Sequence, residues 1–169
     1  MVLLDGKKLA EEILASCQRN ALARKLRLAA ILVGENPVSR IFINRKKKAC
    51  EKTGIGFKLY QFSEKISFEE LKKKIVSIAS DAKNSGIIIQ LPLPQRLVEK
   101  TQELLNLIPF KKDIDVLSEI SLGKFYQGTL KILPPTVRGI LGLLKKYKIS
   151  LKGKDIVIVG AGRLVGFPL

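Results

Sequence analysis

The chain has 169 residues, of which 46% are apolar and 27% are charged, and its formal net charge is +16. This length allows one domain and the start of a second. The sequence contains no histidine. This excludes His-based catalytic triads and His metal sites, so any proton transfer falls to Lys, Asp, Glu or Tyr.

The composition also bears on location and partners. Cys17 and Cys50 lack metal-ligand spacing, so we expect reduced thiols in a cytoplasmic protein. No apolar run approaches the ~18 residues of a membrane span, and the run after Met1 is too short for a signal-peptide core. The lysines are spread over several expected helices and aromatic residues are few, which disfavours a nucleic-acid partner. A simpler interpretation of the net positive charge is that its electrostatic field attracts anionic substrates.

The first third of the chain alternates between helical periodicity and apolar runs. We expect a helix over residues 6–25, a buried strand over 26–33, a helix over 37–53 and a second strand over 57–62. This order is typical of an α/β fold with a mainly parallel sheet.

The helix over residues 37–53 carries the strongest local signals. Asn36 is the expected N-cap and Gly54 the left-handed stop. The expected buried stripe includes Val38 and Phe42, and it continues through Ala49 and Thr53. Lys46 falls on this stripe, where a lysine must snorkel, pair with an acceptor, or lose its proton more easily than usual. A solvated basic face is the plainer interpretation of the same pattern.

The middle of the chain continues the alternation. Ser67 and Glu70 form a capping-box pattern for a helix that runs to about Asn84. We expect a buried strand over 86–90, a helix over 96–108 and a loop over 109–115 that carries two carboxylates.

The last third is less regular. Residues 118–133 are expected to be irregular, with a short hairpin as one form, and Thr136 is the expected cap of a helix through about Tyr147. We expect a strand over 154–159, and the glycines that follow it at 160, 162 and 166 resemble a dinucleotide-binding turn one residue longer than usual.

Polar residues follow the expected strands at the edge where ligands bind in such sheets. Because the carboxyl ends of parallel strands share one edge, Lys46, Gln90 and Asp115 should approach one cleft. Gln90 could instead satisfy loop backbone at the strand end, and Asp113 and Asp115 could instead cap loop turns.

Several segments together carry a resemblance to a known family. They are Val33–Ser39, Lys46–Glu51, Gly86–Pro94, Pro109–Asp115, Pro134–Gly139 and Val159–Pro168. In this order and spacing the chain resembles the N-terminal part of bifunctional methylenetetrahydrofolate dehydrogenase/methenyltetrahydrofolate cyclohydrolase. The resemblance implies a catalytic domain over residues 1–135. It also implies the start of an NAD(P)-binding Rossmann domain over 136–169.

The resemblance implies a role for individual residues. Lys46 corresponds to the catalytic lysine, Gln90 to the active-site glutamine, and Asp115 to the aspartate that holds the pterin ring. Two further groups of residues are expected to contact ligands. Phe42, Leu91 and Pro92 should contact the folate, and Gly160, Ala161, Gly162 and Arg163 should contact the phosphate of the cofactor.

The implied function is folate one-carbon metabolism. The family oxidises 5,10-methylenetetrahydrofolate with NADP, or NAD in some members, and hydrolyses the product to 10-formyltetrahydrofolate. It therefore implies a multifunctional oxidoreductase and hydrolase, a folate substrate, a homodimer, and a supply of one-carbon units for purine biosynthesis. No metal is expected.

Three positions depart from the family pattern. Phe42 replaces a tyrosine, Val116 replaces a glycine, and Pro134-Pro-Thr-Val137 replaces Pro-Cys-Thr-Pro. The family also continues beyond Leu169, so we expect residues from about Lys152 to be loosely held or to pair with a neighbouring chain. The alternatives are a divergent member or fragment, and a non-catalytic folate-binding or dimerising module.

Overall fold

A computed structural model describes residues 3–21, 25–162 and 164–169. Its strands are β1 (Arg27–Val33), β2 (Gly56–Phe62) and β3 (Gly86–Ile89). Its helices are α1 (Gly6–Ala21), α2 (Pro37–Thr53), α3 (Phe68–Ser80), the 3-10 helix η1 (Gln95–Lys100), α4 (Thr101–Leu105), α5 (Glu119–Tyr126) and α6 (Pro135–Lys146). The α/β class with a parallel sheet is confirmed.

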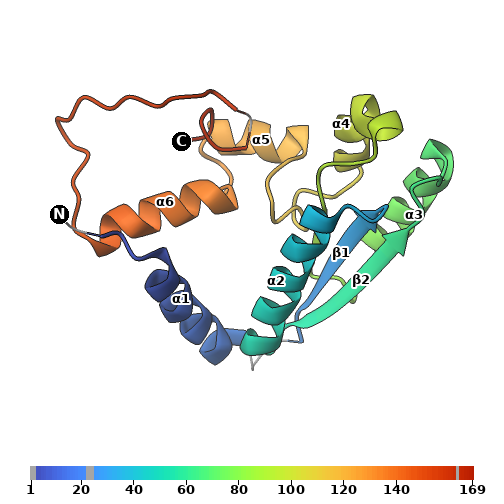
Figure 1. The fold of residues 1–169 in the computed structure, drawn as a ribbon, viewed down its shortest axis with the longest axis horizontal. Helices are drawn as coiled ribbons and strands as arrows, with labels where there is room; N and C mark the ends of the chain where they lie inside the picture. Colours follow the sequence, from blue (N-terminus) through green and yellow to red (C-terminus); the bar gives the residue numbers. More distant parts are fainter. Residues whose placement is uncertain (1–2, 22–24, 163) are drawn as a thin grey trace.

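The sheet has the order β2-β1-β3, and both strand pairs are parallel. Ile31 of β1 lies opposite Tyr60 of β2 and Ile89 of β3. β1 is therefore the central strand, which explains why its sequence is almost continuously apolar. Figure 1 shows α2 in front of this sheet and α3 on the far side.

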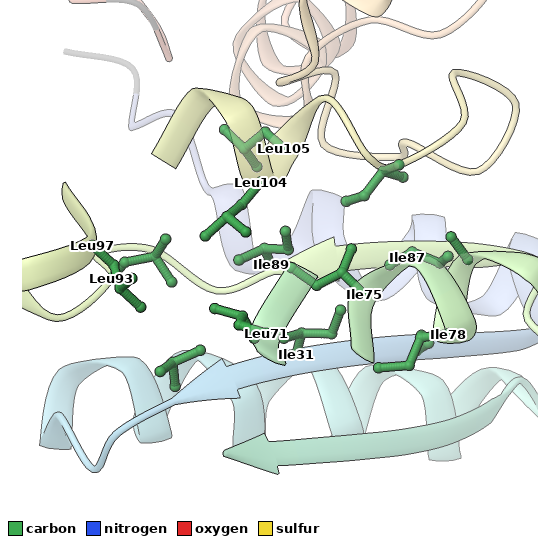
Figure 2. Close-up of a cluster of buried hydrophobic side chains, with 14 of the residues drawn as sticks. Ile31, Leu71, Ile75, Ile78, Ile87, Ile89, Leu93, Leu97, Leu104 and Leu105 are labelled. Atoms are coloured by element: carbon green, nitrogen blue, oxygen red, sulfur yellow. The ribbon is translucent and has the colours of Figure 1, made fainter. Parts of the chain in front are cut away.

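Alternate residues of β1 supply two separate cores. The larger core joins Ile31 to α3, β3, η1 and α4, and Figure 2 shows side chains from these elements gathered in one cluster. The smaller core joins Ala30 and Ile88 of the sheet to Ile43 of α2. Since successive strand residues face opposite sides, the sheet is covered on both faces.

α2 has the caps that the sequence predicts, although its buried face is different. Asn36 accepts a hydrogen bond from the Ser39 N–H at 3.0 Å, and Gly54 adopts φ +71. The buried residues of the helix are Ser39, Ile43, Cys50 and Thr53. The expectation that Val38 and Phe42 are buried is wrong, because they lie 56% and 47% exposed, one position round the helix from the core.

α3 ends four residues earlier than expected. The carbonyls of its last turn accept hydrogen bonds from side chains: Asn84 Nδ2 donates to the Ile78 carbonyl and Lys112 Nζ to the Ala79 carbonyl, at 2.9 and 2.8 Å. These donors satisfy the end of the helix, so no further turn is needed.

The helix expected over 96–108 forms as two short pieces, η1 and α4. The Leu97 N–H donates to the Pro94 carbonyl at 2.8 Å, which closes a tight 3-10 turn directly after the proline. Leu97 and Leu104 both enter the larger core, so each piece is aligned by its own buried leucine.

Residues 118–133 were expected to be irregular, yet they contain α5. Ser118 is its N-cap and accepts a hydrogen bond from the Ser121 N–H at 3.3 Å. The cap of α6 also differs from the prediction, because Pro134 occupies the N-cap position and no side chain caps the helix. Thr136 therefore lies inside the helix and does not cap it.

The strand expected over 154–159 does not form. Ile156, Val157, Ile158 and Val159 are between 45% and 96% exposed, and no strand pairs with them within the described part of the chain. Figure 1 shows this segment as an unpaired trace that runs from the end of α6 back towards α5. A strand needs a neighbouring strand to satisfy its backbone groups, so the apolar sequence alone does not produce one.

Candidate functional site

A pocket of about 400 Å³ opens at the carboxyl edge of the sheet. Its polar lining is Lys46 from α2, Gln90 at the end of β3, Asp115 from the following loop and Thr136 from α6. The remaining lining is apolar: Phe42, Ile89, Leu91, Val116, Leu117, Pro134, Pro135 and Leu164. The pocket therefore combines an apolar wall with a few converging polar groups, the usual character of a small-molecule site.

Lys46 is the centre of the polar group. Its ammonium nitrogen lies 3.4 Å from Gln90 Oε1 and 3.5 Å from Asp115 Oδ2. The lysine side chain is 33% exposed, so it is partly screened from water. Of the three outcomes expected for a lysine on this face, the structure shows pairing with acceptors.

Gln90 combines the two alternatives that the sequence left open. Its backbone N–H donates to the Ile31 carbonyl at 2.9 Å, which continues the sheet by one residue. Its side-chain Nε2 donates to the Leu91 carbonyl at 2.7 Å. That bond satisfies loop backbone and at the same time turns Oε1 towards Lys46.

The two carboxylates of the loop over 109–115 have separate positions. Asp113 accepts hydrogen bonds from the N–H groups of Leu117 and Ser118, at 3.1 and 2.9 Å to Oδ2, so it caps a loop turn. Asp115 faces the pocket and pairs with Lys46. Only one of the two loop carboxylates thus reaches the site.

Burial raises the pKa of the Asp115 carboxyl above its usual value. The positive charge and the hydrogen bond of Lys46 act in the opposite direction, and the nearby charge of Asp113 raises the pKa further. A partly buried carboxylate beside a lysine in a pocket is the kind of group that functional sites contain.

The loop beside Asp115 adopts an unusual backbone conformation. Val116 has φ +57, in the left-handed region, although its side chain is branched at Cβ and only 1% exposed. This conformation is unfavourable for valine and easy for glycine. The backbone therefore keeps the shape that a glycine would favour at this position.

The loop reaches β3 because of a glycine in the strand. Ile87 pairs with Asp113 in an isolated parallel bridge, and the Ile87 N–H donates to the Lys112 carbonyl at 2.8 Å. A Cβ at Gly86 would lie 2.9 Å from the Ile114 side chain. Gly86 thus permits the close approach that places the loop at the edge of the sheet.

The folate-contacting residues expected from the resemblance divide between pocket and surface. Phe42 lines the pocket and is 47% exposed, and the Arg45 guanidinium lies 5.9 Å from the centroid of its ring. Leu91 also lines the pocket. Pro92, which follows a cis peptide bond, is exposed and is not among the described residues of the lining.

The described residues of the glycine-rich turn are not among those that line the pocket. Gly160, Ala161 and Gly162 are exposed, and Arg163 lies outside the described residues. The segment that follows returns to the site: Leu164 lines the pocket, and the Phe167 ring packs edge-on against Tyr126 of α5 with centroids 5.3 Å apart.

Sequence reasoning missed several residues of the pocket wall. Val116 and Leu117 directly follow Asp115, and Pro134 and Pro135 are the N-cap and the first residue of α6, so their positions next to recognised segments were a usable signal. Nothing in the local sequence around Leu164 indicated its place, because the contact depends on how the segment folds back.

Among the described residues, no group of three or more Cys, Asp or Glu side chains could hold a metal ion. No helix in the same set is long and apolar enough to cross a membrane.

Residues 4–115 match the family model described as "Tetrahydrofolate dehydrogenase/cyclohydrolase, catalytic domain". The whole chain is 39% identical to the "Bifunctional protein FolD" of Mesoplasma florum and covers 60% of that protein. It is 40% identical to the protein of the same name from a Sulfurihydrogenibium species and covers 61% of it. The chain therefore spans about 60% of the length of these curated relatives.

Solved structures agree with the fold. The bifunctional FolD dehydrogenase/cyclohydrolase of Campylobacter jejuni superimposes with a TM-score of 0.89 at 38% identity, over 99% of this chain and 61% of that one. A Trypanosoma brucei dehydrogenase-cyclohydrolase, solved with NADP cofactor and inhibitor, superimposes with a TM-score of 0.80 at 26% identity, over 96% of this chain and 55% of that one.

Proposed function

The chain belongs to the tetrahydrofolate dehydrogenase/cyclohydrolase family, and from this membership we propose that its pocket binds a reduced folate and supports one-carbon chemistry on it. One observation carries the proposal. The Lys46 ammonium lies between Gln90 Oε1 and Asp115 Oδ2 at the wall of a largely apolar pocket, at 3.4 and 3.5 Å.

Each polar residue has a chemical task in this proposal. Asp115 accepts hydrogen bonds from the N–H groups of the aminopyrimidinone ring, because a carboxylate is the natural acceptor for adjacent donors. Lys46 carries the proton transfers when water attacks the methenyl carbon and a C–N bond breaks. Gln90 orients the lysine by accepting its hydrogen bond, and the Phe42 ring offers an apolar face to the substrate.

NADP is the cofactor we propose for the dehydrogenase reaction, with NAD as the variant. When bound, its nicotinamide supplies the hydride acceptor. The described residues around Gly160 do not build a site for it, because 154–159 form no strand and 164–168 form turns in place of a helix. A dinucleotide turn presents its N–H groups only between such a strand and helix. The hydrolytic step is therefore the one that this chain's own residues support.

A second candidate function is a folate-binding or dimerising module without turnover. Phe42 favours it, since a phenylalanine at the pocket mouth keeps the ring face but offers no hydroxyl group. The test must therefore separate binding from catalysis.

The test compares Lys46→Met with Lys47→Met in the 169-residue chain. Lys47 is the matched control because it lies on the same helix but pairs with Glu51 at 3.9 Å on the outer, solvent-exposed face. Tetrahydrofolate affinity is measured by calorimetry and hydrolysis of 5,10-methenyltetrahydrofolate by absorbance. We expect Lys46→Met to lower turnover by roughly 10²–10⁴-fold, the usual contribution of a general acid–base group, with affinity largely kept. The control should change neither.

The outcomes separate the two candidate functions. If the wild-type chain binds folate without turnover, the binding module is the better account. If the wild-type chain binds no folate, both candidate functions are refuted.

The proposal extends to the compartment, the oligomeric state and the metabolic role of the protein. We propose a cytoplasmic homodimer with a catalytic domain to about residue 135, which serves purine biosynthesis through 10-formyltetrahydrofolate. The free thiols of Cys17 and Cys50 support the reducing compartment. Sedimentation equilibrium tests the dimer directly.

A further inference from the structure

Asp113 is a buried carboxylate that the proposed chemistry does not use. Its relative exposure is 3%, and no described lysine or arginine pairs with it. Its charge is met by backbone N–H donors: Leu117 N–H at 3.3 Å from Oδ1 and 3.1 Å from Oδ2, and Ser118 N–H at 2.9 Å from Oδ2. A buried charge needs such partners, so its position is closely tied to these two donors.

One of these donors, Leu117, lines the pocket itself, and the other, Ser118, is the next residue along the chain. The carboxylate spans the loop from residue 113 to residues 117 and 118, and it thereby encloses Asp115 and Val116. Val116 holds its unfavourable left-handed φ of +57 inside this closed loop. Something in the surrounding structure must hold that conformation, since a branched residue does not adopt it alone.

Both ends of the loop are fixed. At its start, the Ile87 N–H of β3 donates to the Lys112 carbonyl. At its end, the Ser118 hydroxyl lies 2.8 Å from the Ser121 hydroxyl in the first turn of α5. Asp113 is the one side chain that joins the two fixed ends across the loop in the described structure.

We propose that Asp113 is a positioning residue, whose carboxylate clamps the loop over residues 113–118 and so aims Asp115 at Lys46 and the bound folate. The part that concerns folate rests on the proposed function. Asp113 does not itself line the pocket, so it acts through the Leu117 backbone that it binds and through the neighbouring Asp115 and Val116.

The electrostatics agree with this placement. Two charged groups act on Asp115: Lys46 from α2, which lowers its pKa, and Asp113 from its own loop, which raises it. Asp113 therefore both fixes the position of Asp115 and opposes its ionisation. A residue with a purely structural role elsewhere in the chain would do neither.

The test uses three variants of the 169-residue chain. Asp113→Asn keeps an oxygen acceptor for the two N–H groups but removes the charge, and Asp113→Ala removes both. Asp81→Ala is the matched control: Asp81 also accepts a backbone N–H, from Lys83 at 2.8 Å, and pairs with Arg27, but it lies in the turn after α3 and outside the pocket lining.

Three quantities are measured: the pKa of the Asp115 carboxyl by ¹³C NMR, the HN–Hα coupling of Val116, which reports φ, and the dissociation constant for tetrahydrofolate. Asp113→Asn should lower the pKa of Asp115 and leave the other two unchanged. Asp113→Ala should move the Val116 coupling towards that of ordinary extended backbone. It should also weaken folate binding by roughly tenfold or more, the loss expected when hydrogen bonds to a charged group are removed. Asp81→Ala should change none of the three.

The proposal is overturned if Asp113→Asn leaves the pKa of Asp115 unchanged, or if Asp113→Ala leaves both the coupling and the affinity unchanged. If Asp113→Ala does not fold, Asp113→Ser replaces it, because its shorter side chain cannot span the loop to the two N–H groups, and the Val116 coupling and the folate affinity still decide. If the wild-type chain binds no tetrahydrofolate, the proposed function fails, while the pKa and the coupling still test the clamp.

Discussion

Two apolar runs, each followed by a glycine, have opposite fates in this chain. Arg27–Val33 forms the central strand, and its residues from Ala29 to Val33 are at most 3% exposed. Residues 154–159 form no strand, and Val159 is 96% exposed. The first run has a strand on each side and helices on both faces, whereas the second has neither. The comparison teaches that partners, and not the run of branched residues, decide whether a strand forms.

Hydrogen exchange should show the largest difference between the two runs. The amides of β1 should exchange only on global unfolding, which for a domain of this size corresponds to about 5–15 kcal/mol of protection. The amides from Ile156 to Val159 should exchange nearly as fast as those of an unfolded peptide. Mass spectrometry of the monomer checks this, and strong protection across Ile156–Val159 would refute it.

Truncation of one side chain in each run sharpens the comparison. Ile31→Ala should lower the free energy of unfolding by about 2–5 kcal/mol, because Ile31 is fully buried between β2, β3 and α3. Val157→Ala should change it by less than about 0.5 kcal/mol, since Val157 is 87% exposed. Urea denaturation measures both. Equal losses in the two variants would break the comparison.

Val116 tests whether tertiary partners also override local preference outside the sheet. A left-handed φ costs a residue with a Cβ about 1–2 kcal/mol. Val116→Gly should therefore be more stable than Val116→Ala by up to about 1 kcal/mol, although glycine is smaller and more flexible. Val137, which is 2% exposed inside α6, is the control position. There Val137→Ala should be more stable than Val137→Gly by about 1 kcal/mol, because glycine is unfavourable inside a helix. The same order of stability at both positions would show that residue 116 is not strained in solution.

The smallest expected effect is on the pH dependence of stability. Burial raises the pKa of Asp115, so between the ordinary carboxyl value and the raised one the unfolded chain is ionised while the folded chain still holds its proton. The free energy of unfolding should therefore fall as pH rises through this window, and Asp115→Asn should remove the fall.

Asp81 should make the free energy of unfolding change with pH in the opposite direction, so it serves as the control. Its pKa is lowered, first by the hydrogen bond from the Lys83 N–H and further by Arg27, although partial burial acts the other way. Its contribution is present above the ordinary carboxyl pKa and is lost as pH falls through the lowered value. Urea titrations across the acidic range should thus show that Asp115→Asn and Asp81→Ala change the pH dependence of the free energy of unfolding with opposite signs.

Much of the ordered region could be predicted from local patterns. The caps of α2 at Asn36 and Gly54, the three strands and the approach of Lys46, Gln90 and Asp115 all follow from capping rules, periodicity and the common edge of parallel strands. The α5 helix could have been predicted from Ser118 as a cap, because Glu119 follows it in the first turn.

The remaining errors depend on distant parts of the chain. The buried face of α2 was misplaced because Phe42 is apolar yet lies at the pocket, and only the position of the sheet decides which face is covered. The strand over 154–159 was wrong because strand formation needs a second strand. Leu164 was missed because its contact arises when the end of the described chain folds back onto α5.

The exposed run from Ile156 to Val159 has a consequence for how the protein behaves in concentrated solution. Four successive branched residues without a partner are a template for intermolecular β-pairing. The net charge of +16 keeps molecules apart while the Debye length is about 10 Å, near 0.1 M salt, but at 1 M salt that length shrinks to about 3 Å. Light scattering should therefore show salt-induced aggregation. Val157→Lys should suppress it, because a charge placed within the run protects the open edge even when the overall repulsion is screened.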